Sequence, residues 1–128
     1  MSEAIRILLL RIALIVAGLI CVVGFYPLTV VWPSGWAWGH GHSHYLVMII
    51  GVYATLGVFL LLAACDPLAN RSLIWFTVWS SVVHAAIMAV QSLADSAERG
   101  HLLGDVPALL IVAVVLGFLM PRRQSSAA

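Results

Sequence analysis

The sequence has no lysine, and charged residues make up only 9% of its 128 residues. All of its basic residues are arginine, and the net charge is +1. This balance excludes nucleic acid as a partner, because a protein surface that binds nucleic acid carries a basic patch or stripe. Cysteine is also scarce, with only Cys21 and Cys65 present. A disulfide framework is therefore not predicted.

Apolar residues are abundant instead. They make up 63% of the chain, and the mean hydropathy is +1.10. Four runs stand out, at about 7–26, 44–64, 72–93 and 101–120. A run of about 20 apolar residues is long enough to cross a hydrocarbon core of about 30 Å as a helix. The sequence therefore predicts an all-α fold, a single membrane-embedded four-helix bundle that contacts the lipid bilayer.

The arginines predict the orientation of the bundle. An even number of spans places both termini on one side, and Arg6, Arg11, Arg71, Arg122 and Arg123 flank that side. Only Arg99 flanks the other side. By the positive-inside rule we expect both termini to be cytoplasmic. A multi-pass protein of a bacterial inner (cytoplasmic) membrane is expected, with the two cysteines near opposite faces.

The connection 27–43 is the longest, and it is rich in aromatic residues and histidine. Pro27 and Pro33 argue against a continuous helix there. Trp32, Trp36 and Trp38 are typical of the headgroup zone, where an indole is half wet. We expect this segment to lie along the outer surface, either as a lid over the bundle or as a simple anchor. In the second span, Gly51 and Thr55 are expected to allow a close neighbour.

The third span has a polar stripe. Its members recur at steps of three and four, which places them on one helix face. They are Thr77, Ser81, His84, Met88, Gln91 and Asp95. Because lipid-facing helices avoid such a line, we expect a polar seam inside the bundle. An ionisable residue near the midplane, as His84 is, is a functional candidate.

His84 has three interpretations. It can act in a proton relay with Gln91 and water, or ligate a haem or chlorin. It can also be a neutral residue that hydrogen-bonds to Ser80, Ser81 or Thr55. A cofactor site formed by His84, Gln91 and Met88 is one hypothesis. A direct pair with Asp105 is not expected, because Asp105 should lie about 10 Å nearer the outer surface by helical rise.

The outer ends of the spans collect ligand-type residues in two layers. Helical rise puts the members of each layer at similar depths. The first layer has His44, Asp95 and His101, and the second has Met48, Gln91 and Asp105. Imidazole with carboxylate suits zinc, copper or iron. The predicted metal ligands are His40, His42, His44, Asp95, His101 and Asp105.

Other interpretations of this pattern remain open. No H-E-x-x-H or C-x-x-C motif is present, and interfacial histidines often bind only water and headgroups. Asp105 lies near a helix N-terminus, where a negative charge is favoured without any ligand. Three functions are therefore considered: a polar outer site for a transition metal or other cofactor, an accessory subunit of a larger membrane complex or a homo-oligomer, and a binding protein or enzyme for a lipophilic molecule using His84 and Asp105.

Three stretches carry a resemblance to known sequences. They are WPSGWAWGHGHSHYLVMIIGVYA, DPLANRSLIWFTVWSSVVHAAIMAVQ and GHLLGDVPALL. Over Pro27 to Pro121 the chain resembles an uncharacterised family of small four-span bacterial membrane proteins. The resemblance implies the four-span fold and a bacterial source, and it implies no activity or ligand. In size and span number the chain also looks like small quinone-linked four-span redox subunits, without a motif to support that likeness.

Overall fold

The computed structural model describes residues 1–38 and 43–121. Within them the secondary structure is entirely helical. The first span combines α1 (Glu3–Leu19), the π-helical η1 (Ile20–Gly24) and α2 (Phe25–Val31), and a short α3 (Pro33–Trp36) follows it. The remaining elements are α4 (His44–Ala63), α5 (Arg71–Ala94), the 3₁₀ helix η2 (Ser96–Leu102) and α6 (Asp105–Leu119). Four helical segments are long and apolar enough to cross a membrane, and the all-α prediction is confirmed for the described residues.

The first span is longer than the sequence suggested. Helix continues through Pro27 to Val31, where a loop was expected from residue 27 onward. A proline inside a helix normally clashes with the carbonyl group four residues earlier, which here belongs to Val23. Val23 lies within the π-helical turn of η1, where the wider ladder changes the position of that carbonyl group. The prediction that Pro27 ends the helix was therefore wrong.

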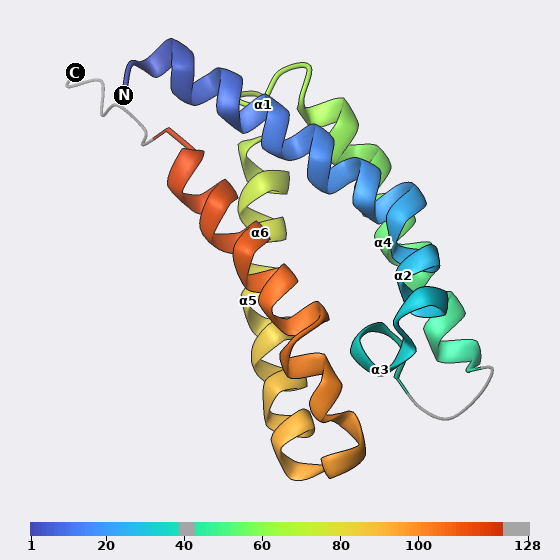
Figure 1. The fold of residues 1–128 in the computed structure, drawn as a ribbon. Helices are drawn as coiled ribbons and strands as arrows, with labels where there is room; N and C mark the ends of the chain where they lie inside the picture. The colour runs from blue at the N-terminus through green and yellow to red at the C-terminus, as the bar shows by residue number, and fades with distance from the viewer. Residues whose placement is uncertain (39–42, 122–128) are drawn as a thin grey trace.

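The helices form two pairs. α1 packs along α4, and α5 packs along α6 and η2. Figure 1 shows the N-terminus and the end of α6 at one end of the bundle, and α3 and η2 at the opposite end. Contacts between α4 and α5 are few. The two pairs are therefore joined at both ends, by α3 against η2 at one end and by α1 against α6 near the termini at the other.

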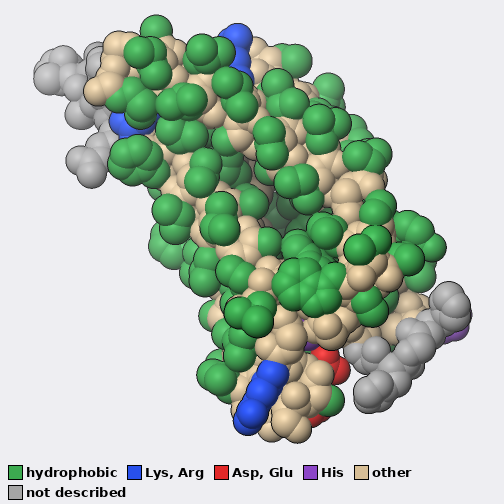
Figure 2. Space-filling view, viewed as in Figure 1, with side chains coloured by type: hydrophobic (Ala, Val, Ile, Leu, Met, Phe, Trp, Pro, Cys, Tyr) green, Lys and Arg blue, Asp and Glu red, His purple; other side chains and the backbone are tan. Residues whose placement is uncertain are grey.

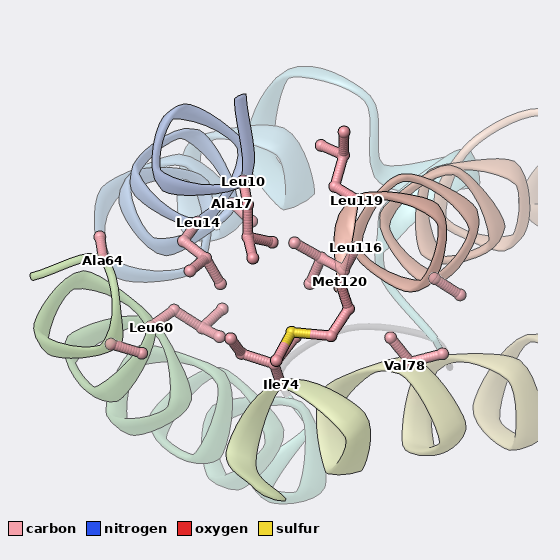
Figure 3. Packing of buried hydrophobic residues seen from close by; sticks show 12 residues of the cluster. Leu10, Leu14, Ala17, Leu60, Ala64, Ile74, Val78, Leu116, Leu119 and Met120 are labelled. Carbon is pink, nitrogen blue, oxygen red and sulfur yellow. The ribbon is translucent and has the colours of Figure 1, made fainter. Parts of the chain in front are cut away.

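That contact region, here called the closed end, is a cluster of buried apolar side chains from all four long helices. Figure 3 shows them pointing toward one another. Its largest fully buried members are Leu10, Leu14, Leu60, Ile74, Leu116 and Met120. Small residues bring α1 and α4 close together here, because a Cβ atom on Gly57 would lie 2.7 Å from the carbonyl oxygen of Gly18. By contrast, a Cβ atom on Gly51 would meet nothing within 4 Å, so the close approach expected at Gly51 was wrong.

Arginine side chains complete the closed end. Arg6 donates to the terminal carbonyl oxygens of α6, including that of Leu119 at 3.1 Å. Arg71 donates to the carbonyl oxygen of Pro121 at 2.7 Å, and Arg11 donates to that of Cys65 at 3.2 Å. The last carbonyl groups of a helix have no partner within the helix and carry its partial negative charge. Arginine satisfies both needs, so the residues that predicted the orientation also hold helix ends together.

Candidate functional site

A cavity of about 840 Å³ lies between the two helix pairs, beyond the closed end. Its walls are largely apolar and come from α1, η1, α2, α4, α5 and α6. Trp36 and Trp38 line it from the α3 segment. The part of the bundle around this cavity is called the open half below. Its polar lining residues are Cys21, Tyr53, Thr77, Ser81, His84 and Asp105.

His84 is paired with a residue that the sequence interpretation did not consider. The hydroxyl group of Tyr53 on α4 lies 2.6 Å from Nδ1 of His84 on α5. A tyrosine hydroxyl that donates to Nδ1 leaves the proton of a neutral imidazole on Nε2. This pair bridges the two helix pairs across the cavity. A mid-span tyrosine needs a partner for its hydroxyl group, and that was the signal that could have identified Tyr53.

Aromatic rings continue from Tyr53 toward the end of the bundle that holds α3 and η2. The ring of Phe25 on α2 is stacked on Tyr53, with centroids 5.2 Å apart and an interplanar angle of 8°. Trp36 meets Phe25 edge-on, with centroids 5.9 Å apart. Rigid rings of this kind hold a wall in place at a low cost in conformational entropy. The aromatic wall joins the first span, the α3 segment and α4.

Asp105 and His101 form a buried pair at the end of the cavity near α3 and η2. Asp105 is 4% exposed and His101 is 0% exposed. Nδ1 of His101 lies 2.9 Å from Oδ2 of Asp105, and the indole N–H of Trp38 donates to the same oxygen at 3.2 Å. The Trp38 ring also stacks on His101, with centroids 4.1 Å apart. The two predicted ligands thus face each other, although His101 lies in η2 and Asp105 begins α6.

The surroundings of this pair leave some polar atoms without a hydrogen bond. Oδ1 of Asp105 is buried and has no hydrogen-bond partner among the described residues. Oε2 of Glu98 lies 3.1 Å from Nε2 of His101, but not in hydrogen-bonding geometry. The indole nitrogen of Trp36 is likewise buried without a partner in the described part of the chain. Buried polar groups are normally satisfied, so such atoms need an explanation.

The α3 segment is fixed over this end of the bundle. A Cβ atom on Gly100 would lie 2.2 Å from the carbonyl oxygen of Ser34, and one on Gly104 would lie 2.2 Å from that of Gly35. Only glycine permits this backbone approach between α3 and η2. It places Trp38 against His101 and Asp105. Of the two interpretations of the tryptophan segment, the lid agrees with Trp36 and Trp38, whereas Trp32 is 40% exposed, as an anchor would be.

Other residues of the predicted sites are not gathered here. Met88 is buried and lines the cavity, but Gln91 is exposed, so only part of the seam faces inward. His44 and Asp95 are exposed, and Asp95 accepts a hydrogen bond from the backbone N–H of Ala97 at 2.9 Å. Met48 is also exposed. The two layers proposed from helical rise are therefore buried only where His101 and Asp105 lie.

The metal hypothesis stays a prediction. Within 1–38 and 43–121, no group of three or more His, Cys, Asp or Glu side chains is arranged to hold a metal ion. His40 and His42 lie outside the described residues. The two cysteines are free, as expected.

Comparisons with known proteins agree with this description without adding an activity. No curated protein and no solved structure matches the chain. The model of a protein family, DUF6632, matches residues 4–126, which is nearly the whole sequence. The chain therefore belongs to DUF6632, a family of unknown function.

Proposed function

We propose that this protein binds a lipophilic molecule in the cavity of the open half. The observation that carries the proposal is the space itself, about 840 Å³ of largely apolar cavity with a few polar groups at defined places. Ligand sites are typically concave and apolar, with a small number of polar groups that fix orientation. Tyr53 with His84 and Trp38 with Asp105 are such groups. A chain that only packed its helices would leave less volume unfilled.

An opening toward the lipid supports the choice of a lipophilic ligand. Val16 on α1 and Ile20 on η1 line the cavity and are also 50% and 45% exposed. Ile111 and Val115 on α6 line it from the other side and are also exposed. Figure 2 shows the surface hollowed between these helices, with hydrophobic side chains around the hollow. A molecule dissolved in the membrane can enter by this route without crossing water.

The setting of the site is part of the proposal. Four membrane-crossing helices and the arginine asymmetry support a multi-pass protein whose termini are cytoplasmic. The α3 segment and η2 would then face the outer side of a bacterial inner membrane. Holding a ligand is compatible with a role as a carrier, as an enzyme or as a subunit of a larger assembly. His84 is the residue we would assign to any acid–base step, because a neutral imidazole can both donate and accept a proton.

The test is native mass spectrometry of protein extracted in mild detergent, followed by solvent extraction and identification of any bound molecule. Ala108 lines the cavity, so Ala108→Trp should fill it and remove the bound species. The matched control is Ala86→Trp, on an exposed position that does not line the cavity. The same samples, analysed for zinc, copper and iron with a His44→Ala/His101→Ala variant, test the metal prediction.

Two results would count against the proposal. One is that the parent protein binds only lipids that are also bound by both variants, Ala86→Trp and Ala108→Trp. The other is a fixed stoichiometry with another membrane protein whose side chains occupy the cavity, which would identify the chain as an accessory subunit. Loss of a bound species in Ala108→Trp alone would support binding in the open half.

A further inference from the structure

We infer that the ligand of the open half has a hydroxyl group as its polar end, and that Asp105 accepts a hydrogen bond from it. This inference rests on the proposed function and names the chemical class of the ligand. It predicts a fatty or isoprenoid alcohol, or a lipophilic phenol, in preference to an ether or ester of the same size.

The first argument is that the two carboxylate oxygens of Asp105 differ in their hydrogen-bond partners. Oδ2 receives both Nδ1–H of His101, at 2.9 Å, and the indole N–H of Trp38, at 3.2 Å. Oδ1 has no well-formed hydrogen bond from the described residues, with only the adjacent backbone N–H of Val106 nearby, and Asp105 is 4% exposed. An ionised carboxylate only accepts hydrogen bonds, so the unpartnered Oδ1 atom requires a hydrogen-bond donor. A buried acceptor without a donor is costly, and a ligand that supplies the donor relieves that cost.

The second argument concerns charge. The carboxylates of Asp105 and Glu98 lie on either side of the His101 ring, 2.9 and 3.1 Å from its two nitrogens. The His101 ring lies between the two carboxylates, and Glu98 keeps access to water because its side chain is 19% exposed. A cationic ligand would also have to lose its hydration in a largely apolar cavity, which is expensive for an ion. A neutral hydroxyl group supplies the missing donor without that penalty.

The third argument is position. Asp105 lines the cavity and is the first residue of α6, beside the α3 segment that covers the outer end. The apolar lining extends from there toward the closed end, past Leu109, Val112 and Leu116 on α6. A molecule with its hydroxyl group at Asp105 would place its apolar chain along these residues. The arrangement suits a single polar end and a long apolar tail.

The experiment uses Cys21 as a reporter, because it lines the cavity and is free. The protein is reconstituted in lipid nanodiscs in a Cys65→Ser background, and the rate of Cys21 alkylation by N-ethylmaleimide is measured. The two probes are 1-dodecanol and dodecyl methyl ether. We expect dodecanol to protect Cys21 at about a tenfold lower concentration than the ether, the size expected for one hydrogen bond to a charged group.

Asp105→Asn sharpens the result. Its amide oxygen can keep the hydrogen bonds from His101 and Trp38, and its NH₂ group then takes the place of Oδ1. The unpartnered acceptor becomes a donor, which can bond to the oxygen of either probe, so the preference for the alcohol should disappear. Asp95→Asn is the matched control, because Asp95 is exposed and does not line the cavity. It should leave the preference of the parent unchanged.

The outcomes separate the two proposals. Equal protection by both probes would overturn the assignment of a hydroxyl ligand while leaving cavity binding intact. Protection by neither probe, together with no bound species in native mass spectrometry, would overturn both. Asp105→Asn that folds and loses both probes equally would make Asp105 a structural residue and contradict the inference. If Asp105→Asn does not fold, the inference is tested on the parent protein alone, by whether dodecanol protects Cys21 better than dodecyl methyl ether does.

Discussion

The closed end and the open half are built from the same four membrane-spanning segments, yet they pack differently. At the closed end Leu10, Leu14, Leu60 and Leu116 are each 1% exposed or less. In the open half a cavity of about 840 Å³ separates the helices, and aromatic and polar side chains bridge it. Tight packing therefore lies toward one end of the bundle and open space toward the other.

The difference shows what holds a small membrane bundle together. Lipid chains are as apolar as leucine, so helices gain little from hydrophobic burial and associate through close packing and hydrogen bonds. The closed end supplies both, through the approach of Gly18 to Gly57 and through arginine bonds to helix ends. The open half can remain hollow because its stability is supplied elsewhere.

The largest expected effect comes from shortening one leucine in each region. Leu14→Ala should lower the free energy of unfolding by about 2 kcal/mol, at the low end for leucine truncation, because the unfolded segment stays in an apolar medium. Leu46→Ala should cost less than about 1 kcal/mol, because Leu46 already borders open space. Unfolding by SDS in mixed micelles measures both. Equal losses would mean that the two regions do not differ in packing.

Two glycines on α4 give the next comparison. Gly57→Ala should cost about 1–3 kcal/mol, because its Cβ atom would force α1 away from α4 at Gly18. Gly51→Ala should be neutral or stabilising by up to about 1 kcal/mol, because alanine favours helix and the site is open. The same SDS titration reports both variants. A Gly51→Ala loss as large as that of Gly57→Ala would show that the open half is occupied by a neighbour.

The smallest expected effect is the loss of one hydrogen bond across the open half. Tyr53→Phe should lower the free energy of unfolding by about 0.6 kcal/mol, the average for hydrogen bonds between membrane helices. Tyr45→Phe, on the same helix but 77% exposed, is the control. His84→Leu should also be tolerated for folding, and the double variant Tyr53→Phe/His84→Leu measures the coupling. A coupling near zero would indicate that the pair does not support the open half.

The sequence predicted the parts of the site that depend on local spacing. His101 and Asp105 were both predicted near the start of the fourth span, in adjacent layers, and the structure places them in contact. The partner of His84 could not be foreseen, because Tyr53 lies 31 residues away and reaches it only when α4 lies opposite α5. The length of the first span was also missed, since the rule that proline ends a helix did not allow for a π-helical turn before Pro27. Gln91 and Asp95 kept the predicted spacing but are exposed, because spacing does not say where a partner helix ends.

The sequence by itself determined the class of this protein. Four apolar runs of membrane-crossing length leave the backbone no alternative to helix in lipid, where every polar backbone group must be satisfied internally. Only the tertiary structure decided where those helices touch and where they part. That choice depends on which side chains meet across helices, and glycine, leucine and tyrosine placed 30 to 100 residues apart have no periodicity that links them. The cavity, the pairing of Tyr53 with His84 and the unpartnered Oδ1 atom of Asp105 all depend on the tertiary structure.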